Sequence, residues 1–226
     1  LYRLDAPVPL SQSLPMLERM GVKVMDERPS EIVRQDGSVV WLHDFGLSFS
    51  AAETLNIHDI QPLFHDTFRR VWSGEVENDD FNRLVLLAGL SWREVSVLRA
   101  YAKHMRQAAF TFSQAYMEQA LACYPQLMRQ LYALFRARFD PALEADREAH
   151  CKDITAQIEA SLNTVANLDE DRILRQFLAV LKAMVRTSAF QPDAAAHAFK
   201  LLPRELSLLP EPRPMFEIFV YSPRFE

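Results

Sequence analysis

The sequence contains few glycines, and their spacing excludes one class of binding site. Only five occur among the 226 residues, and the closest two, Gly37 and Gly46, stand nine residues apart. Nucleotide and dinucleotide sites place two or more glycines within about eight residues, because the backbone must approach the phosphates closely at a helix N-terminus. The glycine patterns of such sites are G-x-G-x-x-G and G-x-x-x-x-G-K-[ST], and neither occurs anywhere in the sequence. We therefore predict that this chain does not hold a nucleotide in that way.

Cysteines and long apolar runs are also few, and the net charge is negative. Cys123 and Cys151 are too few for a disulfide scaffold, which favours a reducing cytoplasm. The longest stretch without a charged residue, residues 6–17, has 12 residues and three prolines, whereas a membrane-spanning helix needs about 20 apolar residues. The net charge of −5 disfavours nucleic acid and anionic lipid as partners. We expect a folded cytoplasmic protein, because 49% of its residues are hydrophobic and 24% are charged.

Reactive side chains form no pattern that predicts an active site. No two of the six histidines have the three- or four-residue spacing of helical metal ligands: His43, His58, His65, His104, His150 and His197. Cys123 lies at an apolar helix end, which favours a buried structural thiol. The acidic groups at residues 79–80, 144–148 and 169–171 are interpreted as solvated helix starts or polar faces. We expect no catalytic, cofactor-binding or metal-binding residue in this chain.

Basic and aromatic residues alternate through residues 129–139, a pattern that also occurs in nucleic-acid-binding helices. However, the aromatic residues Tyr132, Phe135 and Phe139 fall on the apolar stripe of the predicted helix. Core packing is therefore the preferred interpretation.

Residues 1–50 predict a small β-α-β-β unit. Residues 2–4 are a short strand candidate, and apolar residues spaced three to four apart over 9–20 predict a helix. Gly21 stands where a C-terminal helix cap is expected. Strands are predicted at 22–25, continuing at 32–33, and at 38–44 after the hairpin signal Asp36-Gly37.

The periodicity becomes helical after residue 55, and residues 90–190 predict a bundle of four to six helices. Ser91 and Glu94 have the spacing of a capping box. The apolar stripe of the helix that follows is Val95, Leu98, Ala102, Met105, Ala109 and Phe112. Further helices are predicted to begin near Pro125, at Asp140-Pro141 and at residues 169–171. The last of these has Met184 and Val185 on its buried face.

The end of the sequence changes character again. Four prolines in residues 203–214 predict a non-helical linker, and residues 215–221 predict a strand. The sequence begins without methionine, and both of its ends lie beside strand-like segments. We therefore expect a piece of a longer protein.

Four segments resemble one family. They are NRLVLLAGLSWREV at 82–95 with LRAYAK at 98–103, NLDEDRILR at 167–175, LPEPRPMFEIFVYSPR at 209–224, and VMDERP at 24–29 with WLHDFG at 41–46. They resemble the large bacterial NAD-specific glutamate dehydrogenases, multidomain chains several times longer than this one. The resemblance spans residues 22–226 in the same order.

This resemblance implies a mostly helical α+β fold: a small ACT-like βαββ unit, a multi-helix bundle and a C-terminal strand. Residues 1–50 are then the end of an ACT-like domain, 51–202 a helical domain, 203–214 a Pro-rich linker and 215–226 the first strand of the catalytic domain. The parent enzyme would oxidise L-glutamate to 2-oxoglutarate and ammonium with NAD, as a homo-oligomer. Its catalytic and NAD-binding residues would lie beyond residue 226, so none is carried onto this chain.

We accordingly interpret the chain as a non-catalytic segment that couples regulatory domains to the catalytic domain. Two alternatives stay open. In one, the ACT-like part senses an amino acid near Asp26, Arg28 and His43, although turn and edge positions explain these residues as well. In the other, the chain is a stand-alone helical adaptor whose exposed face binds another protein.

Overall fold

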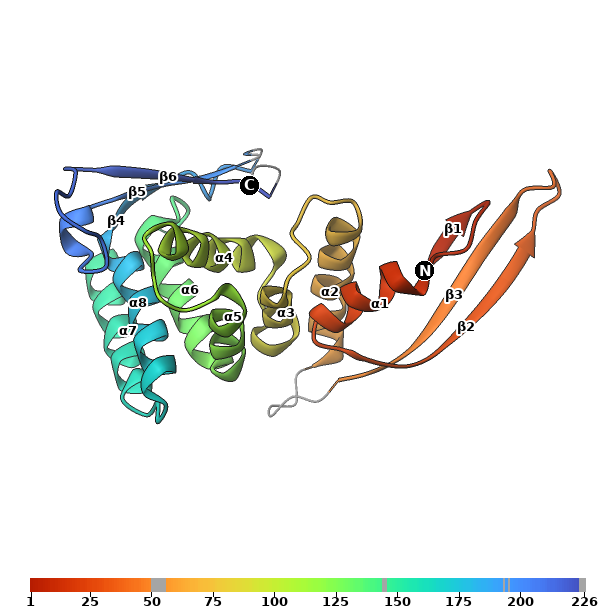
Figure 1. The fold of residues 1–226 in the computed structure, drawn as a ribbon, viewed down its shortest axis with the longest axis horizontal. Coiled ribbons are helices and arrows are strands. Elements are labelled where there is room, and N and C mark those ends of the chain that lie inside the picture. The colour runs from red at the N-terminus through yellow and green to blue at the C-terminus, as the bar shows by residue number, and fades with distance from the viewer. Residues whose placement is uncertain (50–55, 144–145, 193, 195, 224–226) are drawn as a thin grey trace.

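The computed structural model of the chain describes residues 1–49, 56–143, 146–192, 194 and 196–223. Two small sheets lie well apart, with helices between them (Figure 1). The predicted boundary between residues 50 and 51 and the acidic residue Glu144 lie outside the described residues.

The predicted β-α-β-β unit is confirmed. It consists of β1 (Tyr2–Leu4), α1 (Leu10–Arg19), β2 (Lys23–Val33) and β3 (Val39–Ser48). Strand β3 lies between β1 and β2 and is antiparallel to both. The crossover from β1 through α1 to β2 therefore skips one strand position, which is the split βαβ arrangement.

Turn residues set the bounds of these elements. Gly21 follows α1 with φ +89° and Gly37 turns the hairpin with φ +83°, both in the left-handed region that glycine enters without strain. Asp36 Oδ1 accepts a hydrogen bond from the Ser38 N–H at 3.0 Å and stabilises the turn. Strand β2 runs without a break through Pro29 because it is an edge strand, where a missing N–H breaks no ladder.

Helix α2 (Ile57–Trp72) joins this unit to the helical region. A small core cluster contains Leu17 and Met20 at the end of α1, Phe68 of α2 and Leu86 of α3 (Arg83–Ala88). In Figure 1, α1 lies between α2 and the sheet, while the β2–β3 hairpin extends away from the helices.

The helical bundle follows, and its apolar faces are largely those predicted. It comprises the 3-10 turn η1 (Asp80–Asn82), α3, α4 (Trp92–Gln107), α5 (Gln114–Cys123), α6 (Pro125–Phe139), α7 (Arg147–Leu162) and α8 (Leu168–Ala183). The capping box is present: the Ser91 N–H donates to Glu94 Oε2 at 2.6 Å, and the Glu94 N–H donates to Ser91 Oγ at 3.4 Å. Pro125 opens α6, where its missing N–H leaves no broken bond.

Two predicted helix bounds between residues 95 and 147 are wrong. The helix through 95–112 ends at Gln107, because Ala109 adopts φ +58° and Ser113 then caps α5. The helix expected from Asp140-Pro141 begins only at Arg147. Asp140 instead accepts a hydrogen bond from the Ala142 N–H at 2.9 Å and pairs with Arg136 at 3.0 Å.

The end of the chain forms a sheet that the sequence did not predict. Helix α8 ends at Ala183, so Met184 and Val185 belong to β4 (Met184–Thr187) and not to a helix face. Strand β5 (His197–Leu201) pairs antiparallel with β4 and with β6 (Glu217–Tyr221). The predicted linker begins with a 3-10 turn, η2 (Pro203–Glu205), and Leu206 after it is fully buried. One face of this sheet packs on the bundle through Phe199, Leu201, Phe219 and Tyr221.

We predict that Gly89→Ala destabilises the protein by about 1 kcal/mol. Gly89 ends α3 at φ +63° with no atom within 4 Å of an added Cβ, so backbone strain is the whole cost. Thermal unfolding followed by circular dichroism measures this loss. Gly89→Asn is the matched control, since asparagine tolerates this conformation better. Equal losses for both variants would contradict the explanation.

Candidate functional site

Helix α4 is buried on every side over residues 95–102. Ten of its 16 residues are buried, and they include Ser96, Arg99 and His104. Buried polar groups are costly unless they are hydrogen-bonded. The partners of α4 come from three separate parts of the chain: α2, the segment before α3, and the β4–β5–β6 sheet. We call α4 together with these contacts the α4 junction and treat it as the candidate functional site.

Arg99 connects α4 to the segment that precedes α3. Its side chain is 0% exposed. Arg99 Nε donates to Asp79 Oδ2 at 2.6 Å and Nη2 donates to Asp79 Oδ1 at 2.8 Å, so the carboxylate is held in a two-pronged contact. Nη2 also donates to Asn82 Oδ1 at 2.8 Å. Asn82 is itself fixed because its Nδ2 donates to the Glu77 carbonyl at 2.9 Å.

The surrounding charges stabilise the ionised form of this buried arginine. Burial disfavours the charged form, but the Asp79 carboxylate outweighs burial and raises the pKa of Arg99 above its usual range. Lys103 Nζ lies 3.1 Å from Glu77 Oε2, which adds a second ion pair beside the first. Burial also raises the pKa of Tyr221 well above its ordinary value, and Arg99 only partly opposes this rise. The Tyr221 hydroxyl therefore stays protonated at neutral pH.

The C-terminal half of α4 contacts strand β6. His104 is buried, and its Nε2 lies 3.3 Å from Glu217 Oε2. The His104 ring packs edge-on against Phe219, with ring centroids 5.4 Å apart. One polar and one apolar contact therefore fix the position of β6 on α4.

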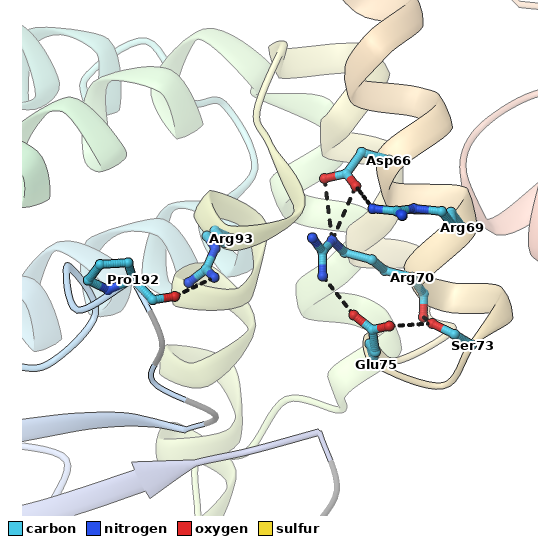
Figure 2. A network of polar contacts seen from close by, with 7 residues as sticks. All are labelled: Asp66, Arg69, Arg70, Ser73, Glu75, Arg93 and Pro192. Atoms are coloured by element: carbon cyan, nitrogen blue, oxygen red, sulfur yellow. Dashed lines mark hydrogen bonds and ion pairs between the residues drawn. The ribbon is translucent and has the colours of Figure 1, made fainter.

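The N-terminal end of α4 contacts helix α2 through Arg70. Figure 2 shows Arg70 between two carboxylates: its Nε lies 3.2 Å from Asp66 Oδ1, and its Nη1 lies 2.6 Å from Glu75 Oε2. The Arg70 guanidinium carbon lies 4.2 Å from the centre of the Trp92 ring, a cation–π distance. Partial burial raises the pKa of Asp66, but hydrogen bonds from Arg69 and Arg70 outweigh burial and bring it below its ordinary value.

Arg93 provides a second connection at this end. Its Nη2 donates to the Pro192 carbonyl at 2.9 Å (Figure 2), and its guanidinium carbon lies 4.7 Å from the Trp92 ring centre. Pro192 belongs to the segment that leads into β5. Helix α4 thus contacts α2, the segment before α3, and the β4–β5–β6 sheet.

The residues weighed for amino-acid sensing do not form one site. His43 is buried in the β1–β3–β2 sheet: its Nε2 accepts from the Val8 N–H at 2.9 Å, and its Nδ1 lies 2.7 Å from Glu27 Oε1. Asp26 and Arg28 pair with each other at 3.5 Å in solvent. Because His43 and Asp44 alternate along β3 and Arg28 pairs opposite Asp44, Arg28 and His43 point to opposite faces.

Two interpretations of single residues were wrong, and one was right. Cys123 is exposed and not buried, because it lies in the last turn of α5 on the side away from the core. Asp79 is not a solvated charge, since it holds Arg99. Phe135 is buried in the bundle core, as expected, while the neighbouring Arg138 donates at 2.8 Å to the Met184 carbonyl.

Arg99 itself was missed by the sequence analysis, although a signal was present. It stands four residues after Val95 and three before Ala102, and therefore on the apolar stripe of α4. A charged residue at such a position requires a buried partner, which the sequence does not identify.

Neither a metal cluster nor a membrane-spanning helix occurs in the described part of the chain. No three His, Cys, Asp or Glu side chains gather there in a way that suits a metal ion. None of the described helices is both long enough and apolar enough to span a bilayer.

Comparison with known proteins agrees with the family resemblance of the four segments. Three family models match: "Glutamate dehydrogenase, ACT3 domain" over residues 1–60, "Glutamate dehydrogenase, helical motif 3" over 76–141, and "Bacterial NAD-glutamate dehydrogenase, catalytic domain" over 157–226. Proteins named NAD-specific glutamate dehydrogenase align with the whole chain at 41% identity in Halomonas elongata and 39% in Pseudomonas aeruginosa. The protein of this name from Mycobacterium tuberculosis is 41% identical over 96% of the chain.

The chain belongs to the NAD-specific glutamate dehydrogenase family. It spans about 14% of the length of these three relatives. Within this glutamate dehydrogenase segment, the α4 junction joins different matched regions. Asp79 and Arg99 lie in the helical motif 3 match, whereas His197 and Glu217 lie in the catalytic domain match.

We predict that Asp79→Asn lowers the free energy of unfolding of this glutamate dehydrogenase segment by about 3–5 kcal/mol. The substitution removes the carboxylate that pairs with the fully buried Arg99 at 2.6 Å and leaves Glu77 Oε2, 4.0 Å from Arg99 Nε, as a much weaker counter-charge. The double variant Asp79→Asn/Arg99→Met recovers at least about half of this loss, since an apolar residue replaces the stranded charge. Urea unfolding followed by circular dichroism measures both. Asp153→Asn, on the exposed face of α7, is the control, and a similar loss there would contradict the prediction.

A second prediction concerns pH. Burial, and then the positive charge of Arg93, lower the pKa of His197 below its ordinary value of 6.5. The unfolded chain therefore binds the proton first, so stability is full above about pH 6.5 and is lost as the pH falls through the folded pKa. Urea unfolding between pH 5 and pH 8 should show this slope in the wild type and a flatter one in His197→Gln. Identical slopes would contradict it.

Proposed function

We propose that this chain is a non-catalytic segment of an NAD-dependent glutamate dehydrogenase, and that it couples the ACT-like unit to the catalytic domain. The reaction of the whole protein would be the oxidation of L-glutamate by NAD and water to 2-oxoglutarate, ammonium and NADH. The observation that carries the coupling role is the position of α4, which contacts α2, the segment before α3 and strand β6 through buried or paired charges.

Buried charged contacts suit a coupling role better than apolar contacts would. An apolar interface tolerates small shifts in register, whereas a two-pronged arginine–carboxylate contact at 2.6 and 2.8 Å has one low-energy geometry. Because the segment that carries Asp79 follows α2 along the chain, a displacement of α2 would be transmitted through Asp79 to α4 as a rigid element and from there to β6. Such transmission requires packed elements with defined contacts at both ends.

Catalysis is proposed to lie outside these residues. The glycine spacing of the sequence is unsuited to a dinucleotide site, and the charged clusters around Arg99 and Arg70 are engaged in ion pairs within the chain. L-Glutamate, 2-oxoglutarate and NAD would then bind to other parts of the full-length protein. The other domains of the full-length protein would be the immediate partners of this segment. We propose that the protein is located in the cytoplasm.

We predict that Glu217→Gln and Arg70→Gln change the regulation of the full-length enzyme without unfolding it. Both residues lie at the ends of the junction and are partly exposed, so neither change strands a buried charge. Loss of such a contact alters coupling by about 0.5–2 kcal/mol. Steady-state kinetics with a panel of amino acids as effectors, together with sedimentation, measure the change.

Glu31→Gln on the exposed edge of β2 removes the same charge as Glu217→Gln and is its control. The coupling proposal is wrong if both junction variants fold and retain wild-type kinetics, effector response and oligomeric state. Separately, the 226-residue chain alone should not reduce NAD with L-glutamate. Turnover by the purified chain would overturn the proposal that this segment is non-catalytic.

A further inference from the structure

A pocket beside the α4 junction is not explained by the coupling role. It has a volume of about 250 Å³ and lies between α2, the start of α4, and strands β5 and β6. Its polar lining includes Arg70, Glu75, Arg93, Ser96, His197 and Tyr221. Binding pockets combine an apolar wall with a few convergent polar groups. Here the ring of Trp92 and the side chain of Pro192 supply apolar surface.

The two arginines of the pocket differ in how much of their charge and how many of their N–H donors are paired. Arg70 is neutralised by Asp66 and Glu75, at 3.2 and 2.6 Å. Arg93 has one hydrogen bond, to the Pro192 carbonyl, and among the described residues it has no ion pair. A guanidinium group carries five N–H donors. Arg93 therefore has a full positive charge and unused donors at the pocket wall.

The position of Arg93 is fixed before any ligand arrives. The Trp92 ring lies 4.7 Å from its guanidinium carbon, and the Pro192 carbonyl lies 2.9 Å from its Nη2. Figure 2 shows the Arg93 side chain extending between Pro192 and Arg70. A charged fork held in place in this way loses little conformational entropy on binding.

The other polar groups of the pocket are neutral or already paired. His197 is 6% exposed, and its Nδ1 has no hydrogen-bond partner among the described residues. Its imidazole is uncharged at neutral pH, and the Tyr221 hydroxyl is protonated. Glu75 is engaged by Arg70 and by Ser73, whose Oγ donates to Glu75 Oε1 at 2.9 Å.

From this geometry we infer that the pocket binds a small carboxylate, held by the guanidinium fork of Arg93. A singly charged, planar carboxylate matches the fork and accepts two parallel N–H bonds. A phosphate dianion fits less well, because the Glu75 carboxylate lines the same small pocket and repels a second negative charge. The site goes beyond the proposed function, and its test does not depend on catalysis or coupling.

Nuclear magnetic resonance titration of the 226-residue chain tests this inference, with sodium acetate as the probe. The side-chain N–H resonances of Trp92 and Arg93 report on the pocket. Sodium chloride at equal ionic strength separates binding from screening, and sodium phosphate separates the two anions. We expect saturable shifts with acetate in the millimolar range, weaker binding of phosphate, and only linear shifts with chloride.

Variants decide whether Arg93 is responsible. Arg93→Gln should weaken acetate binding by about tenfold or more, since a charged hydrogen-bonded contact is lost. Arg93→Lys keeps the charge but not the fork, and should weaken it to a smaller extent. Arg34→Gln, in the exposed hairpin turn, makes the same charge change elsewhere and should bind as the wild type does.

Three results would overturn the inference. They are acetate shifts that follow chloride, an Arg93→Gln variant that binds acetate as tightly as the wild type, and phosphate binding tighter than acetate. The folded state of each variant is checked by its amide spectrum. Should Arg93→Gln fail to fold, Arg93→Lys alone decides: unchanged acetate affinity contradicts the role of the fork, and weaker affinity supports it.

Discussion

A fully buried guanidinium group tolerates very few arrangements of the residues around it. The cost of burying the charge of Arg99 is offset because Asp79 accepts two hydrogen bonds from its guanidinium group and Asn82 accepts a third. Asp79 and Asn82 are close enough to do so only if the segment before α3 folds back against α4. The remaining neighbours follow from this constraint, since Glu77 then meets Lys103 and Tyr221 packs beside the same arginine.

The same helix also positions α2 and strand β6. At its start, Trp92 meets Arg70 of α2, and α2 shares the smaller core cluster with α1. Toward its end, His104 and Glu217 fix β6, and β6 holds the β4–β5–β6 sheet on the bundle. The ACT-like unit and the sheet have no need to touch each other, because α4 contacts elements attached to both. This arrangement supports the proposed coupling role.

Local signals in the sequence predicted much of this fold. The capping box at Ser91, the hairpin signal at Asp36-Gly37 and the first-turn proline of α6 act over a few residues, so their physics is contained in the sequence itself. The predictions failed where residues distant in the sequence determine whether a segment is helix or strand. Met184 and Val185 continue the helical periodicity of α8, but β5 offers a hydrogen-bonding edge that converts them into strand β4. Ala109 lies in step with the apolar stripe of α4, yet the chain leaves the helix there to begin α5.

The candidate site is likewise divided between features that the sequence alone determines and features that depend on the tertiary structure. Composition, the five glycines and the four family-like segments determined the class of protein and disfavoured a nucleotide site of the glycine-rich kind, because those features depend on residue identity and spacing alone. Only the tertiary structure decided that Asp79, 20 residues from Arg99, is its counter-charge, and that Arg93, Trp92 and His197 line one pocket. Such partners are chosen by packing in three dimensions, where the cost of burying a charge selects one neighbour among many carboxylates of equal local character.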